Sequence, residues 1–140
     1  MSNLILPNQA KLNWAQSQID DSPTLSGATI RLYDSPLVIT SATTLEALEA
    51  VQATFPGYAA KLLDEWSDAV MIAGLAGTEA DPVVWEATED TEGLVYGLYV
   101  VNGAGDRLLG VCPFESPVPI PFNVELQAVI QIDFDSIFST

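Results

Sequence analysis

Residues 94–114 contain two apolar runs separated by turn-forming residues, and this pattern predicts a β-hairpin. The turn cluster is Asn102-Gly103-Ala104-Gly105-Asp106, in which Gly and Asn tolerate positive φ. In the first arm the two alternating sets of residues are Leu94, Tyr96, Leu98, Val100 and Val95, Gly97, Tyr99, Val101. Because both sets are apolar, we expect this strand inside a sandwich or against a neighbouring subunit.

Further strands are predicted from shorter patterns. Residues 124–134 alternate most regularly, which indicates one face on the core and one in solvent. Five shorter strands are expected, at residues 29–33, 37–39, 58–66, 69–75 and 83–88, although residues 58–66 and 69–75 could equally extend a helix. Residues 117–122 alternate proline with apolar residues, which predicts a polyproline-like piece at a sheet edge or subunit boundary.

One short helix is predicted at residues 43–54. Thr43 and Glu46 have the spacing of a capping box, and apolar residues then repeat on one face. Residues 55–57, Phe-Pro-Gly, are expected to end it.

Residues 1–28 hold neither a period of 2 nor one of 3.6 throughout, so they predict an extended arm with at most one short helical turn. The arm can pack on its own domain or cross to another subunit. Its apolar anchors, which we interpret as partner-binding residues, are Leu4, Ile5, Leu6, Leu12, Trp14 and Ile19.

These elements predict a mainly β protein of one globular domain. The expected fold is an antiparallel, jelly-roll-like β-sandwich over residues 29–140, with one short α-helix and the extended N-terminal arm over residues 1–28. The length of 140 residues and the 49% hydrophobic content suit such a domain.

The net charge of −15, from 19 acidic and four basic residues, limits which partners the protein can bind. It repels nucleic-acid phosphates and anionic lipids, so neither a nucleic acid nor a membrane is expected as a partner. The acidity favours solubility at high local concentration, with mimicry of a nucleic acid as the alternative. With no secretory signal and no apolar run of membrane-spanning length in the sequence, we expect synthesis in the host cytoplasm.

Candidate chemistry is sparse. The sequence has no histidine, and Cys112 is its single cysteine, expected to be buried and inert. Clustered carboxylates occur, but residues 86–92 lack the order of a calcium loop, and close pairs are inevitable among so many acidic residues. The aromatic residues suit core packing better than a sugar-stacking platform. We therefore expect no enzymatic activity, no catalytic residues, no metal and no cofactor.

The order of several segments resembles a known group of proteins. The segments are Ile30-Arg31-Leu32-Tyr33, Ala42-Thr43-Thr44-Leu45, Phe55-Pro56-Gly57-Tyr58-Ala59-Ala60, Trp66-Ser67, the hairpin from Tyr96-Gly97-Leu98-Tyr99-Val100 to Gly105-Asp106-Arg107-Leu108-Leu109, and the Phe114-x-x-Pro117 exit. Together, over residues 29–134, they resemble small all-β virion structural proteins of tailed bacteriophages, which decorate virions. The arm is not covered by this resemblance.

The resemblance implies a capsid cement, or decoration, protein on the capsid surface of a virion. Its implied partners are the major capsid protein and further copies of itself, in a trimer. The apolar hairpin and the proline-rich edge give the predicted subunit interface, which comprises Tyr99, Val101, Val118, Ile120 and Phe122. One alternative is a tail or fibre component that recognises glycans on the host surface. Another is a free inhibitor or acidic mimic that binds a basic host protein.

Overall fold

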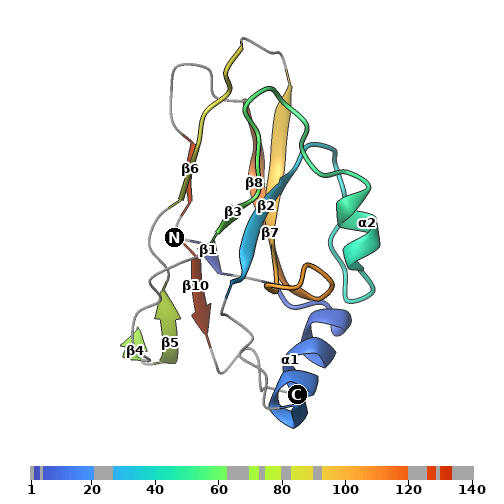
Figure 1. Cartoon of the computed structure of the whole chain (residues 1–140), viewed down its shortest axis with the longest axis vertical. Coiled ribbons are helices and arrows are strands. Elements are labelled where there is room, and N and C mark those ends of the chain that lie inside the picture. The colour runs from blue at the N-terminus through green and yellow to red at the C-terminus, as the bar shows by residue number, and fades with distance from the viewer. Residues whose placement is uncertain are drawn as a thin grey trace.

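The computed structural model is mainly β, with ten strands and two helices in the part of the chain that it describes (Figure 1). That part comprises residues 2–3, 5–20, 27–62, 70–72, 75–79, 83–89, 93–119, 126–128 and 130–133.

A four-stranded antiparallel sheet, here called the central sheet, organises the molecule. Its strands in spatial order are β3 (Lys61–Leu62), β2 (Thr29–Tyr33), β7 (Leu94–Val101) and β8 (Leu108–Pro119). The ladder between β7 and β8 runs from Leu94 opposite Pro119 to Val101 opposite Leu108, which confirms the predicted hairpin. The ladder is irregular between Val95 and Gly97 and between Val100 and Val101.

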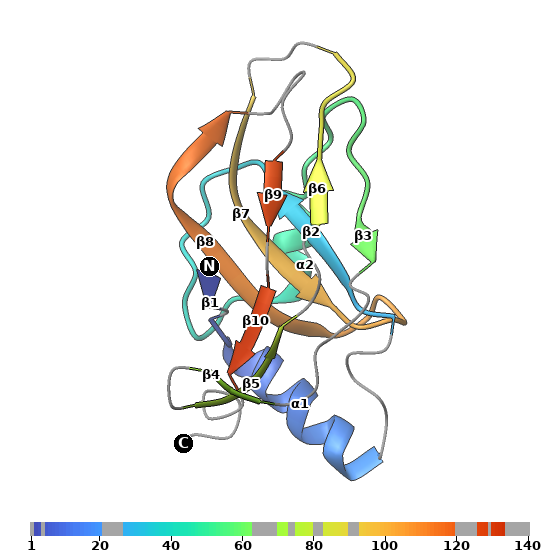
Figure 2. The ribbon, with the colours of Figure 1, turned by 90° about the vertical axis from the view of Figure 1, so that its left-hand side faces the viewer.

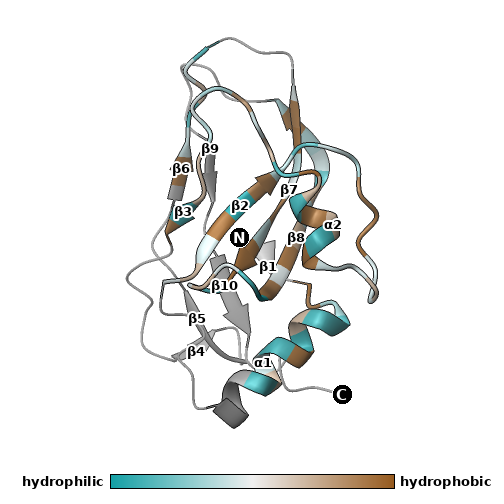
Figure 3. Cartoon of the chain, turned by 45° about the vertical axis from the view of Figure 1, so that its right-hand side comes forward, coloured by the Kyte–Doolittle hydropathy of each residue, from teal (hydrophilic) through white to brown (hydrophobic). Residues whose placement is uncertain are grey.

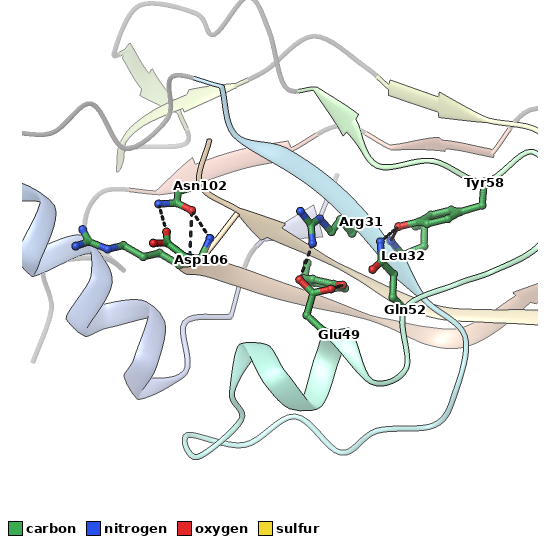
Figure 4. Close-up of polar contacts among 9 residues, drawn as sticks. Arg31, Leu32, Glu49, Gln52, Tyr58, Asn102 and Asp106 are labelled. Atoms are coloured by element: carbon green, nitrogen blue, oxygen red, sulfur yellow. Dashed lines mark hydrogen bonds and ion pairs between the residues drawn. The ribbon is translucent and has the colours of Figure 1, made fainter. Parts of the chain in front are cut away.

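Local hydrogen bonds explain why this hairpin turns where it does (Figure 4). The Asn102 side-chain oxygen accepts from the backbone N–H groups of Asp106 and Arg107, each at 3.1 Å. The Asn102 amide also donates to the Asp106 carboxylate at 3.0 Å. Gly105 has a φ of 80°, a conformation that glycine adopts without steric cost. The turn residues therefore close the hairpin by themselves.

Two smaller sheets accompany the central sheet. One has the order β1 (Ser2–Asn3), β10 (Ile130–Asp133), β5 (Leu75–Glu79) and β4 (Val70–Ile72), and β1 is parallel to β10. The other pairs β6 (Val83–Trp85) with β9 (Leu126–Ala128). Figures 1 and 2 show β6 and β9 over one face of the central sheet, while helix α2 (Leu45–Glu49) lies over the other.

Each face of the central sheet carries its own buried cluster. On one face Trp14, Phe55 and Trp85 pack against Ile30, Leu32, Leu98 and other buried residues of the sheet. On the other face Leu45 and Leu48 of α2 join a second cluster, whose sheet members are Tyr33, Tyr99, Val101, Leu108 and Val111. Val95 and residues 97–101 of β7 are therefore buried on both faces of the sheet within one chain.

The predicted extended arm is wrong over most of its length, because Asn8–Asp20 forms the 13-residue helix α1. Alanine, leucine, lysine and glutamine in this segment are good helix formers. Ala10 and Trp14, one turn apart, are the buried positions among the described side chains of the helix. So narrow a buried stripe leaves no visible apolar period in the sequence.

The predicted helix at residues 43–54 is shortened to α2, Leu45–Glu49, and its N-cap is Thr44 instead of Thr43. The Thr44 side chain accepts from the Ala47 N–H at 3.3 Å. The helix ends early because the following residues bond to β2. The Ala53 N–H donates to the Leu32 carbonyl at 2.8 Å, and Gln52 forms an isolated bridge with Tyr33.

The shorter predicted strands have mixed outcomes. Residues 37–39 belong to no ladder, and the strands at residues 58–66 and 83–88 reduce to β3 and β6 within the described residues. The strand at residues 69–75 corresponds to β4 and the first residue of β5. The long strand at residues 124–134 is two strands, β9 and β10, which belong to different sheets. Residues 117–119 lie at a sheet edge as expected, but as the end of β8, not as a polyproline piece.

Candidate interaction surface

β8 is the last strand of the central sheet, and the N-terminal segment (residues 5–14) lies along its outer edge. Ile5 forms an isolated antiparallel bridge with Val111. The Ile5 N–H donates to the Val111 carbonyl at 2.6 Å, and the Val111 N–H donates back to the Ile5 carbonyl at 2.8 Å. Both backbone groups of Val111 that a foreign strand could use are thus occupied.

Helix α1 continues this cover toward the start of β8. The Asn13 side-chain amide donates to the Leu108 carbonyl at 2.9 Å, and the Trp14 indole N–H donates to the Leu109 carbonyl at 2.9 Å. These carbonyls lie where the ladder between β7 and β8 is irregular. The Trp14 ring is only 5% exposed, so one side chain both fills the core and caps a strand edge.

Further contacts hold the N-terminal segment on its own chain. The Asn8 N–H donates to the Ser41 carbonyl at 2.9 Å, and the Gln9 side-chain oxygen accepts from the Leu45 N–H at 2.7 Å. Leu6 is half-buried against both core clusters. In the single chain, therefore, this segment packs on its own domain.

The predicted partner-binding anchors divide into three groups. Ile5 and Leu12 are 46% and 69% exposed, so both remain available to a partner. Leu6 and Trp14 pack inside the single chain, where the core buries the Trp14 ring, so their role as partner-binding anchors stays a prediction. Leu4 and the side chain of Ile19 lie outside the described residues.

The predicted subunit interface is also largely internal. Tyr99 and Val101 have no exposed surface and belong to the cluster under α2, so their assignment to an interface is wrong. The apolar second face of the hairpin is covered by a helix of the same chain, which the sequence pattern could not reveal. Val118 is half-buried on β8, opposite Val95. Ile120 and Phe122 lie outside the described residues.

A polar cluster beside Tyr99 joins α2 to the central sheet (Figure 4). Arg31 on β2 forms an ion pair with Glu49 at the end of α2, at 2.5 Å, and the Tyr99 hydroxyl donates to the same carboxylate at 3.5 Å. Burial and the negative charge of Glu49 raise the pKa of Tyr99. The cluster's contacts run between α2 and the sheet, so they fit a structural role.

Tyr58 makes the neighbouring polar link. Its hydroxyl accepts from the Leu32 N–H at 3.2 Å and from the Gln52 side-chain amide at 2.9 Å. Burial raises the pKa of Tyr58. These bonds fix the segment after α2 against β2.

Charge is divided unevenly between residues 1–19, which include the N-terminal segment, and the rest of the chain. Residues 1–19 contain Lys11 and no Asp or Glu, so all 19 acidic residues lie in residues 20–140. Figure 3 shows the described part of α1 as a mixture of hydrophilic and hydrophobic residues along the outside of the molecule. The pattern of apolar and polar positions does not show this acid-free stretch, which appears only when charge is counted by segment.

No group of three or more metal-ligating side chains occurs among the residues that the structure describes. Within the same part of the chain, no helix is long and apolar enough to cross a membrane. Comparisons with protein-family models, with curated proteins and with solved structures find no match for this chain.

Proposed function

We propose that this chain is a virion structural protein of a tailed bacteriophage, a capsid cement or decoration protein. It binds across neighbouring major capsid subunits, forms a homo-oligomer, expected to be a trimer, and resides on the capsid surface. The arrangement that we propose for its sheets is an antiparallel, jelly-roll-like sandwich, and the antiparallel central sheet supports it. The resemblance over residues 29–134 supports the class of protein, and the N-terminal segment supports the mode of attachment.

The observation that carries the proposal is the contrast between the N-terminal segment and the acidic remainder. The segment has no carboxylate, yet it presents Ile5 and Leu12 with 46% and 69% of their surface in solvent. A partner surface can approach this segment with little electrostatic repulsion and bury both side chains. Because full burial of such a side chain from water contributes roughly 1.5–3 kcal/mol, burial of the part that is still exposed contributes a fraction of that.

The alternative as a glycan-binding tail module has less support. Sugar stacking needs exposed aromatic faces, and the described side chains of Trp14, Tyr33, Trp85 and Tyr99 are buried. Among the described aromatic residues, the most accessible are only half-buried, and these are Tyr58, Tyr96 and Phe114. The cement role therefore remains the better-supported proposal.

The deciding experiment is the copy number of this protein in purified virions, relative to the major capsid protein. A number comparable to that of the major capsid protein is expected for cement. A small fraction of it would move the protein to the tail, where glycan-binding assays would follow. Absence from virions would contradict both roles and favour a free inhibitor.

Attachment is then tested with point substitutions, because deletion of residues 1–28 would also remove Trp14 from the core. Leu12→Glu places a charge on an exposed helix position and should reduce co-sedimentation with capsids. The matched control is Leu62→Glu on β3, at the opposite end of the central sheet, where the side chain is 51% exposed. Equal co-sedimentation of the two variants would contradict attachment through the N-terminal segment.

A further inference from the structure

The outer edge of β8 divides into two parts with different capacities to accept a strand. Residues 113–119 include Pro113, Pro117 and Pro119, none of which has an N–H to donate. Residues 108–112 contain no proline, and this is the stretch that the N-terminal segment covers. The part of the edge able to add a strand is therefore the part that is occupied.

The cover is held largely through the backbone of β8. Ile5 pairs with both the N–H and the carbonyl of Val111, while Asn13 and Trp14 donate to the carbonyls of Leu108 and Leu109. An identical segment from another copy of the chain can make the same bonds, since the edge and its occupant are unchanged.

Charge makes the N-terminal segment a better-suited occupant than the acidic remainder of a second copy. Two chains with a net charge of −15 repel each other. Residues 1–19 carry Lys11 and no acidic residue, and they are the longest acid-free stretch of the sequence, so they meet little electrostatic repulsion when they approach another acidic chain. The N-terminal segment is complementary to the β8 edge in backbone bonding and to the whole chain in charge.

We propose that the β8 edge at residues 108–112 is a joint between copies, in which the N-terminal segment of a second copy replaces the chain's own. This joint specifies how copies associate, so it rests on the homo-oligomer of the proposed function. It does not require a capsid. Reciprocal exchange joins two copies, and exchange in one direction around a closed ring joins three or more.

The test uses two full-length variants, both in a Cys112→Ala background. One carries Ile5→Cys and the other Val111→Cys. Residues 5 and 111 exchange both backbone hydrogen bonds, a pairing with Cα atoms about 5.5 Å apart that suits a disulfide. The variants are mixed at high protein concentration and oxidised, and intact mass spectrometry identifies the products. A disulfide between the two different variants is the expected main product.

Two controls make the result decisive. Leu62→Cys in place of Val111→Cys reports random collision, because Leu62 is exposed on the strand at the other end of the sheet. A single chain with both Ile5→Cys and Val111→Cys, oxidised at low concentration, reports that the substitutions fold and pair. Two results together would overturn the joint. The chain with both cysteines forms only an intramolecular disulfide at every concentration, and the mixture of Ile5→Cys and Val111→Cys gives no more intermolecular disulfide than the mixture with Leu62→Cys. Capsid binding is measured separately, so failure of the joint and failure of the cement role are distinguishable.

Discussion

Along the outer edge of β8, residues 108–112 and residues 113–119 limit pairing with other strands in two different ways. Three prolines in the second stretch lack a donor, a property that is local and independent of the rest of the fold. The first stretch has no such residue, and its bonding groups are occupied by Ile5, Asn13 and Trp14 from the start of the chain. Pairing at residues 113–119 is thus limited by composition, and pairing at residues 108–112 by tertiary structure. Only the second limit can be lifted without a change of sequence, because the covering segment can leave the edge and an identical segment can take its place.

The largest effect is expected from breaking the cover at Trp14. Trp14→Ala removes a buried ring and leaves the Leu109 carbonyl without its indole donor, so the free energy of unfolding should fall by about 3–5 kcal/mol. Urea denaturation measures the change. Leu12→Ala on the same helix is the control and should stay within about 0.5 kcal/mol, because Leu12 is mostly exposed. If both variants lost the same free energy of unfolding, Trp14 would contribute no more to the stability of the chain than the exposed Leu12.

A second substitution tests the boundary between the two halves. Gly97 lies opposite Pro113, and a Cβ there would collide with the Tyr33 phenol and come within 2.7 Å of the Cys112 carbonyl oxygen. Gly97→Ala should therefore cost about 1–3 kcal/mol in the free energy of unfolding through overpacking. Gly97→Ala combined with Tyr33→Leu should recover part of the loss. No recovery would place the strain at Cys112 instead.

Alkaline pH should weaken the packing around this boundary. Burial, with a smaller contribution from Cys112, raises the pKa of Tyr33 from 10.0 to about 12. Above pH 10 the unfolded chain releases this proton while the folded chain retains it, so stability falls between pH 10 and about pH 12. The slope is at most about 1.4 kcal/mol per pH unit for each tyrosine.

Tyr33→Phe is the matched control for that pH dependence, followed by denaturation at several pH values. Among the described residues the Tyr33 hydroxyl is buried without a hydrogen-bond partner, so its removal should be close to neutral at pH 7. The alkaline slope should become shallower. An unchanged slope would assign the effect to Tyr58 and Tyr99, whose pKa values burial also raises.

The smallest change in stability is expected on the proline half. Pro117 and Pro119 are exposed, so Pro117→Thr with Pro119→Thr should alter the free energy of unfolding by no more than about 0.5 kcal/mol. The variant gains backbone donors on an edge strand, and light scattering should detect more self-association than in the wild type. Ser116→Thr, on the same exposed stretch, adds no donor and should behave as wild type. If both variants match the wild type, the prolines are not what limits pairing there.

Much of the central sheet was predictable because its signals are local. The alternation in residues 94–101 and the Asn-Gly turn at Asn102 specify a hairpin from neighbours within a few residues, and the structure confirms it. The prolines of β8 likewise predicted an edge, and residues 117–119 lie on one. Even so, the alternation shows that Tyr99 and Val101 need cover but not which element provides it, and in the structure that element is α2.

The structure and position of the N-terminal segment depend on contacts between residues far apart in the sequence. Trp14 and its acceptor at Leu109 are 95 residues apart, and Gln9 bonds to Leu45 at a separation of 36. Such pairings leave no periodic trace, so an apparently extended arm is a helix that covers a strand edge. The sequence alone determined a mainly β chain with a closed hairpin and a proline-limited edge, because turns, alternation and missing donors are properties of short segments. Only the tertiary structure decided what covers the rest of that edge, because the choice depends on which distant segment can fill the remaining hydrogen bonds.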